Sequence, residues 1–189
     1  MLSTSQSLLQ RACGEEPRAW ERLCTLYGPM VYAWCRRAGL QDCDAADVVQ
    51  EVFRAVFQHL KDFQARGGVF HAWLGKITAN QVRQYFRQQR RLRLACLGQQ
   101  AVEVADPAPS PEWESEWEHP SCRQQVIQRA LELIRTEFTS TTWECFVRTT
   151  LQGQSSVDVA AYLGMNPNAV RQARYRVLHR LRQELEGLL

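Results

Sequence analysis

The stretch "VDVAAYLGMNPNAVRQARYRVLHRLR", residues 157–182, has the pattern of two short helices joined by a tight turn. Glycine takes positive φ values easily, so Gly164 can end the first helix. Asn166 and Pro167 are residue types that begin a second helix. With Ser156 as the first position, the apolar or small residues at helix-packing positions are Val159, Ala160, Leu163, Met165, Val170 and Ala173. The stretch therefore predicts a helix-turn-helix.

The face of the second helix that points away from this apolar seam is polar and basic. Side chains of these types reach base edges or phosphates from a helix in the major groove. A basic helix can also present nothing more than a solvated face, but the turn glycine and the cap beside it favour DNA binding. Arg180 and Arg182, further along, are expected to contact phosphates or solvent. The candidate DNA-binding residues are Asn168, Arg171, Gln172, Arg174, Tyr175 and Arg176.

The charge distribution along the 189 residues is uneven, although the formal net charge is only +3. Residues 81–93 and 171–182 each contain five arginines and no acid, whereas residues 98–119 contain six acids and no Lys or Arg. The stretch "ADPAPSPEWESEWEHP", residues 105–120, holds four of the seven prolines and shows no helical or strand period. No alternating run of strand length is present. We expect an all-α fold: two small helical domains joined by a proline-rich acidic linker.

The amino-terminal half contains an amphipathic stretch, "DAADVVQEVFRAVFQHL", residues 44–60. Apolar residues recur there at helical spacing (Val49, Val52, Phe53, Val56, Phe57 and Leu60). A polar stripe runs along the other face and consists of Asp47, Gln50, Glu51 and Arg54. Taken alone, this stripe is interpreted as a solvated helix face.

A longer helix is predicted by "VFHAWLGKITANQVRQYFRQQRRLR", residues 69–93, with Leu74, Ile77 and Tyr85 pointing inward. Its other face carries Lys76, Asn80, Arg83, Arg87 and Arg90 over about 21 Å, which is long enough to follow several phosphates. Phe63, Phe70 and Trp73 can stack on unpaired bases, although Trp73 also fits a core position. The glycines of "KDFQARGGVF", residues 61–70, predict a mobile loop before the helix.

The remaining sequence features argue against several classes of protein. The seven cysteines are odd in number and include no CxxC pair, so we expect reduced, mostly buried thiols and no zinc or other metal site. The four histidines are scattered, and HExxH, GxSxG and phosphate-loop motifs do not occur, so we expect no enzyme activity and no cofactor. Neither a signal peptide nor a long apolar run is present, which predicts a cytoplasmic protein without a membrane segment.

Three segments together resemble the two domains of a bacterial RNA polymerase sigma factor of the extracytoplasmic-function (ECF) type. They are "DAADVVQEVF", "GGVFHAWLGKITANQVRQYFR" and the stretch from "TWECFVRTT" to the last residue. The likeness covers residues 17–93 and 124–189. It implies a region-two-like domain at 1–95, a linker at 96–121 and a region-four-like helix-turn-helix domain at 122–189.

The resemblance also implies roles for the candidate residues in transcription initiation. Asp47, Gln50, Glu51 and Arg54 would dock on the clamp helices of the largest subunit of core RNA polymerase. Lys76, Asn80, Arg83 and Arg87 would contact the minus-ten element of promoter DNA, and the loop from Phe63 to Phe70 would hold a base flipped out of the duplex. The second helix of the helix-turn-helix would read the minus-35 element, and an anti-sigma factor is a further implied partner.

The sequence departs from relatives at details that matter for specificity. His71 stands where an arginine is frequent, so a phosphate contact there is expected to be weak or pH-dependent. The outward residues of the recognition helix also differ from the common choices, so the promoter sequence does not follow from the resemblance. The alternative function is a stand-alone helix-turn-helix regulator, which would bind duplex DNA without polymerase and would leave the stripe beginning at Asp47 without a role.

Overall fold

The structure is a computed structural model that describes residues 7–66, 69–97 and 120–188. All regular secondary structure in these ranges is helical, so the expected fold class is confirmed. The described helices form two compact units, one from residues 9–125 with 187 and 188, the other from residues 126–186 with 7 and 8. Most of the expected linker, residues 98–119, lies outside the described residues.

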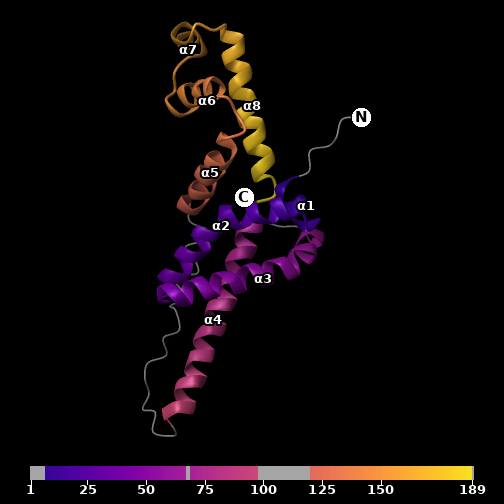
Figure 1. The fold of residues 1–189 in the computed structure, drawn as a ribbon, viewed down its shortest axis with the longest axis vertical. Helices are drawn as coiled ribbons and strands as arrows, with labels where there is room; N and C mark the ends of the chain where they lie inside the picture. Colours follow the sequence, from indigo (N-terminus) through magenta and orange to yellow (C-terminus); the bar gives the residue numbers. More distant parts are fainter. Residues whose placement is uncertain (1–6, 67–68, 98–119, 189) are drawn as a thin grey trace. The chain divides into compact units, whose positions relative to one another are not determined.

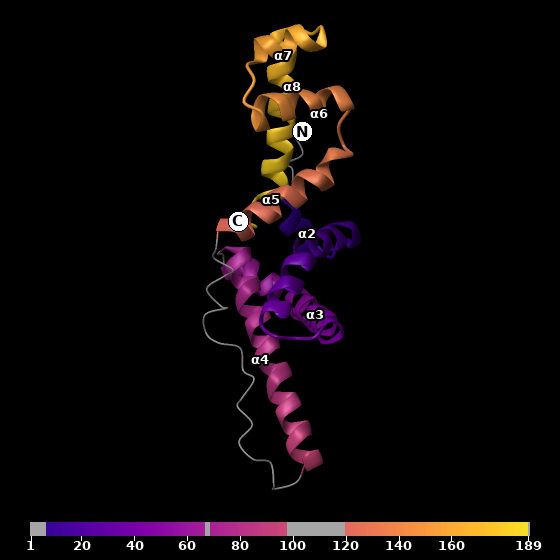
Figure 2. The same ribbon diagram turned by 90° about the vertical axis from the view of Figure 1, so that its left-hand side faces the viewer.

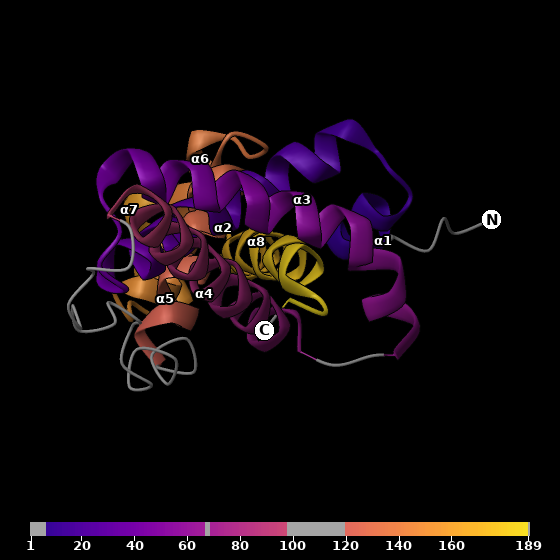
Figure 3. The same ribbon diagram turned by 90° about the horizontal axis from the view of Figure 1, so that it is seen from below.

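The amino-terminal unit contains α1 (Leu8–Cys13), α2 (Pro17–Arg37), α3 (Asp42–Arg66) and α4 (Phe70–Leu97), and α2, α3 and α4 all contact one another. Figure 3 views this unit from the exposed end of α4, with α3 beside it. Pro17 occupies the first turn of α2, where its missing N–H costs no hydrogen bond. Side chains three or four residues apart then form one buried face of α2, including Leu23, Tyr27, Val31 and Trp34.

The two halves of α4 have different surroundings. Phe70, Leu74 and Val82 in the first half are fully buried, whereas every residue from Arg90 to Ala95 is exposed. In Figures 1 and 2 the second half projects beyond α2 and α3. Its arginines are therefore accessible from several sides.

The carboxy-terminal unit consists of α5 (Pro120–Arg135) from Val126 onward, α6 (Ser140–Phe146), η3 (Val147–Leu151), α7 (Ser156–Leu163) and α8 (Pro167–Leu185). The element η3 is a turn of π-helix that continues directly from α6. One core cluster joins α6, α7 and α8 through Cys145, Val159, Ala160, Val170 and Ala173. A second joins α5, α6 and α8 through Ile134, Phe146 and Val177.

The helix-turn-helix forms as the sequence predicts. The hydroxyl of Ser155 accepts from the backbone N–H of Asp158 at the start of α7. Gly164 follows α7 with φ 64° and ψ 34°, in the left-handed region. The side-chain oxygen of Asn166 accepts from the backbone N–H of Asn168 at 2.8 Å and so caps α8. These local signals set the turn, and the buried Val170 and Ala160 hold the two helices together.

Gly164→Ala is expected to destabilise the carboxy-terminal unit by about 1 kcal/mol. An added Cβ would meet no atom within 4 Å, so the cost comes from the left-handed backbone and not from a clash. Gly164→Asn is the matched control, since asparagine tolerates this conformation better and should cost less. Hydrogen exchange of the α7 and α8 amides measures both variants. Equal protection in wild type and Gly164→Ala would contradict the expectation.

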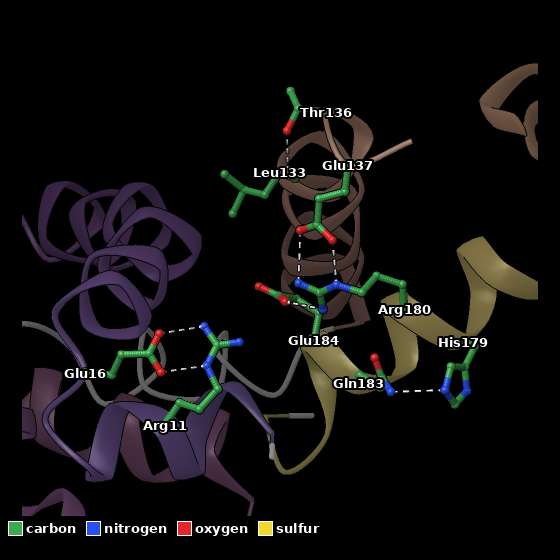
Figure 4. Close-up of polar contacts among 9 residues, drawn as sticks. All are labelled: Arg11, Glu16, Leu133, Thr136, Glu137, His179, Arg180, Gln183 and Glu184. Atoms are coloured by element: carbon green, nitrogen blue, oxygen red, sulfur yellow. Dashed lines mark hydrogen bonds and ion pairs between the residues drawn. The ribbon is translucent and has the colours of Figure 1, made fainter. Parts of the chain in front are cut away.

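Arg180 is part of a polar cluster in the carboxy-terminal unit, which corrects the expectation that it contacts phosphate or solvent (Figure 4). Its Nε lies 2.7 Å and its Nη2 3.0 Å from the two carboxylate oxygens of Glu137, just after α5. Its Nη1 lies 2.7 Å from Oε2 of Glu184, whose side chain is only 1% exposed. Arg180 therefore ties α8 to the segment after α5.

Two further expectations are corrected in the amino-terminal unit. Phe63 and the residues up to Arg66 belong to the last turns of α3, so the connection to α4 is shorter than the expected loop, and Gly67 and Gly68 within it lie outside the described residues. His71 is 2% exposed and packs edge-on against Trp34 at 5.6 Å between ring centroids. A ring buried in this way is a core side chain and is not placed to contact a phosphate.

Candidate nucleic-acid interface

The exposed face of α8 presents all six predicted DNA-binding residues. At 100° per residue, Asn168, Arg171, Gln172 and Tyr175 fall opposite the buried Val170, Ala173 and Val177. Arg174 and Arg176 lie on the two flanks of this face and are also exposed. A helix arranged in this way offers amides and guanidinium groups to base edges at its centre and cations to phosphates at its sides.

Two residues of α8 outside the predicted set, His179 and Gln183, continue this face. The imidazole of His179 stacks on the ring of Tyr175, with centroids 5.7 Å apart and planes 12° apart. The amide nitrogen of Gln183 lies 3.0 Å from Nε2 of His179 (Figure 4). The spacing of four residues between Tyr175, His179 and Gln183 was a signal in the sequence that could have identified them.

The predicted basic stripe on α4 is present and exposed. Lys76, Asn80, Arg83 and Arg87 all lie on the surface of α4, at intervals of three or four residues. The guanidinium of Arg83 donates to the side-chain oxygen of Asn80 at 3.1 Å. On the opposite face, burial and a hydrogen bond to Asp44 raise the pKa of Tyr85 to about 12, so its hydroxyl remains a donor that joins α4 to α3. The helix that carries the stripe is therefore attached to α3 through its opposite face.

A pocket of about 590 Å³ opens beside this stripe, between the end of α3 and the start of α4. One wall consists of Trp73, whose ring stacks on that of Phe63 with centroids 4.6 Å and planes 23° apart; Phe63 itself is only 7% exposed. Lys76 and Arg66 add cations to the lining, and His59 and Asp62 add polar groups. Aromatic and cationic groups in one concave site suit an unpaired base with its phosphate.

Phe70 does not have the stacking role that the sequence suggested. It is 0% exposed and packs edge-on against Tyr27, with centroids 5.2 Å apart. It also contacts Phe63 and Trp73, at 5.9 and 5.6 Å between centroids. Phe70 therefore supports the pocket wall from the core, because it lies at the first position of α4 on the inward side.

The polar stripe of α3 is exposed along its whole length. Asp47, Gln50, Glu51 and Arg54 are all on the surface, and Arg54 forms an ion pair with Glu51 at 2.6 Å. One turn further, Phe57 is 49% exposed, although its apolar character had suggested the buried face. Its ring lies against Trp20 of α2, with centroids 5.2 Å apart. The α3 surface therefore combines a charged stripe with an aromatic pair.

Most of the described thiols are at least partly shielded from solvent. Cys35, Cys122 and Cys145 are buried, Cys13 and Cys24 are half-buried, and Cys43 is exposed. Burial raises the pKa of Cys24 to about 11 and that of Cys35 to about 12, so both stay protonated at neutral pH. Among residues 7–66, 69–97 and 120–188, no group of three or more His, Cys, Asp or Glu side chains could hold a metal ion. None of the described helices is long and apolar enough to cross a membrane.

Comparison with known proteins finds that this chain is similar to RNA polymerase sigma factors. The family described as Sigma-70 region 2 matches residues 23–92, which include α3 and the stripe of α4. The RNA polymerase sigma factor CnrH of Cupriavidus metallidurans is 31% identical over 194 residues, covering 96% of this chain and 92% of CnrH.

Two further likenesses are less complete. The ECF RNA polymerase sigma factor SigE of Mycolicibacterium smegmatis is 29% identical over 171 residues, covering 90% of this chain. That alignment spans only 62% of SigE, so more than a third of that relative lies outside the match. The solved structure of CnrH in complex with the cytosolic domain of CnrY covers 92% of each chain at 22% identity, with a TM-score of 0.38.

Proposed function

Because this chain belongs to the RNA polymerase sigma factors of the ECF type, we propose that it binds core RNA polymerase and directs it to promoters through the surfaces on α3, α4 and α8. The observation that carries the proposal is the placement of two exposed basic faces on separate units, each opposite a packed core. The residues at 1–95 serve as the region-two-like domain, those at 96–121 as the linker, and those at 122–189 as the region-four-like domain. No cofactor and no catalytic residue are needed for this function.

The carboxy-terminal unit reads the minus-35 element in this proposal. The amino-terminal half of α8 enters the major groove, as the second helix of a helix-turn-helix does. Asn168, Arg171, Gln172 and Tyr175 contact base edges, and Arg174 and Arg176 contact phosphates on either side.

The amino-terminal unit recognises and opens the minus-ten element. Lys76, Asn80, Arg83 and Arg87 follow the backbone, and one extruded base enters the pocket beside Phe63 and Trp73. Extruding a base costs a few kcal/mol, which stacking of about 1–3 kcal/mol per base can offset. The stripe of α3 docks on the clamp helices of the polymerase. An anti-sigma factor, as the resemblance implies, is the proposed negative regulator, and the chain acts in the cytoplasm where the polymerase is found.

Run-off transcription tests the proposal directly. Core polymerase with and without the purified chain is given a panel of candidate promoters, beside a gel shift with the chain alone. Transcripts that depend on the chain, with little shift by the chain alone, are expected. A strong shift by the chain alone, without core binding or transcript, would instead indicate a stand-alone helix-turn-helix regulator.

Asp47→Ala combined with Gln50→Ala is expected to weaken binding to core polymerase about tenfold or more, because both side chains belong to the docking stripe. Both are exposed, so the unit should remain folded. The matched control is Glu21→Ala with Gln41→Ala, which likewise removes one acid and one glutamine from exposed positions outside the stripe. Holoenzyme assembly is measured by competition for core polymerase. Equal assembly by the two double variants would rule out the stripe as the docking surface.

A further inference from the structure

Four residues of α8 form a straight ridge on its exposed side, which we call the α8 ridge: Arg171, Tyr175, His179 and Gln183. Residues four apart on a helix lie one above another, and each side chain leans toward the amino terminus of the helix. His179 therefore leans over Tyr175, and Gln183 leans over His179. The observed contacts follow this order, with the ring stack at 5.7 Å and the amide-to-imidazole contact at 3.0 Å.

The stack matters because Tyr175 is 66% exposed, so burial in the core does not order its ring. An exposed aromatic side chain loses rotamer freedom when it binds, and this loss weakens binding. A ring already held by a neighbour has lost most of that freedom beforehand. His179 in turn is held by the hydrogen bond from the Gln183 amide.

Tyr175 and His179 lie at different distances from the start of α8, and this difference indicates which of them reaches the bases. Tyr175 lies eight residues after Pro167, about 12 Å along the axis, and His179 lies about 6 Å further. In a helix-turn-helix the amino-terminal residues of the second helix reach the bases. His179 lies beyond that part of the helix, and its ring contacts the ring of Tyr175. The apolar group that the major groove offers such a ring is the C5-methyl group of thymine.

We propose that His179 and Gln183 are positioning residues that hold Tyr175 against a thymine methyl group in the upstream promoter element. The inference rests on the proposed function of α8 and adds to it the base group that Tyr175 reads and the residues that order Tyr175.

The test uses holoenzyme on a promoter mapped by run-off transcription, with each thymine of the upstream element replaced singly by deoxyuridine. Wild-type holoenzyme should lose affinity at one such position by about fivefold or more, and Tyr175→Ala should lose sensitivity at that position. His179→Ala should weaken binding to the unmodified promoter roughly twofold to tenfold. His179→Phe, which keeps a ring for stacking, should retain most of the affinity. In the Tyr175→Ala background, His179→Ala should cause no further loss of affinity.

Several results would overturn the inference. If His179→Phe is as weak as His179→Ala, stacking on Tyr175 does not account for the role of His179. If His179→Ala has the same effect with and without Tyr175, the two residues act independently. If no deoxyuridine position distinguishes wild type from Tyr175→Ala, the ring does not read a methyl group. Arg171→Ala tests the proposed function of α8 separately. It should weaken binding to the upstream element whether or not His179 holds Tyr175.

Discussion

Arg180→Ala is expected to lower the free energy of unfolding of the carboxy-terminal unit by about 2 kcal/mol. The substitution removes both hydrogen bonds to Glu137 and the ion pair with the buried carboxylate of Glu184. Burial by itself lowers the pKa of Arg180, but the hydrogen bonds and charges of the two glutamates outweigh it and the pKa is raised. The guanidinium is therefore charged at any physiological pH, and Arg180→Ala removes a positive charge from the cluster.

The size of this effect lies between two limits. Exposed ion pairs contribute about 0–1 kcal/mol, and breaking a fully buried pair costs about 3–5 kcal/mol. Arg180 is 23% exposed and Glu137 34%, while Glu184 is 1% exposed. The cluster is thus buried on one side only, which places the expected cost between the limits.

Hydrogen exchange of amides in α5 and α8 of the full chain measures the local free energy of opening. Arg182→Ala is the matched control, since it removes an exposed arginine two residues away on the same helix. Arg180→Met combined with Glu184→Met should recover part of the loss, because the buried charge leaves together with its partner. If Arg180→Ala and Arg182→Ala reduce protection equally, the cluster does not stabilise the unit.

Arg83→Ala combined with Arg87→Ala is expected to impair promoter opening and to make it less sensitive to salt. Each cation that neutralises a phosphate releases counterions, with a slope of about −0.9 per phosphate for duplex DNA and −0.7 for a single strand. Losing two contacts should therefore reduce the slope of log affinity against log salt by about 1.4 to 1.8. The effect on affinity should be largest at low salt.

The slope is measured from open-complex formation by holoenzyme across a range of salt concentrations. Arg18→Ala with Arg123→Ala provides a control of the same net charge, using exposed arginines outside the stripe. The control should change the slope less, because neither arginine belongs to the stripe that is proposed to follow the phosphates. An unaltered slope in Arg83→Ala with Arg87→Ala would show that this part of α4 does not follow the backbone.

The sequence alone determined the features that depend on residues near one another in the chain. Gly164 ends α7 in the left-handed region and Asn166 caps α8, as expected, because turn and cap conformations are set within a few residues. The exposed stripes of α3, α4 and α8 were also predictable, since the helical period decides which residues share a face. Whether those stripes bind polymerase and promoter remains a prediction that the experiments above test.

Only the tertiary structure decided how deeply each residue is buried and what it contacts. Phe57 repeats at the spacing of buried residues yet is half exposed, while Phe70 and His71 are buried despite their apparent suitability for DNA. Arg180 looked like another cation for phosphate, but Glu137 lies 43 positions away in the sequence and binds it. The physical reason is that helical period orders side chains around one axis only. Which side of that axis becomes the interior depends on the other helices that pack against it.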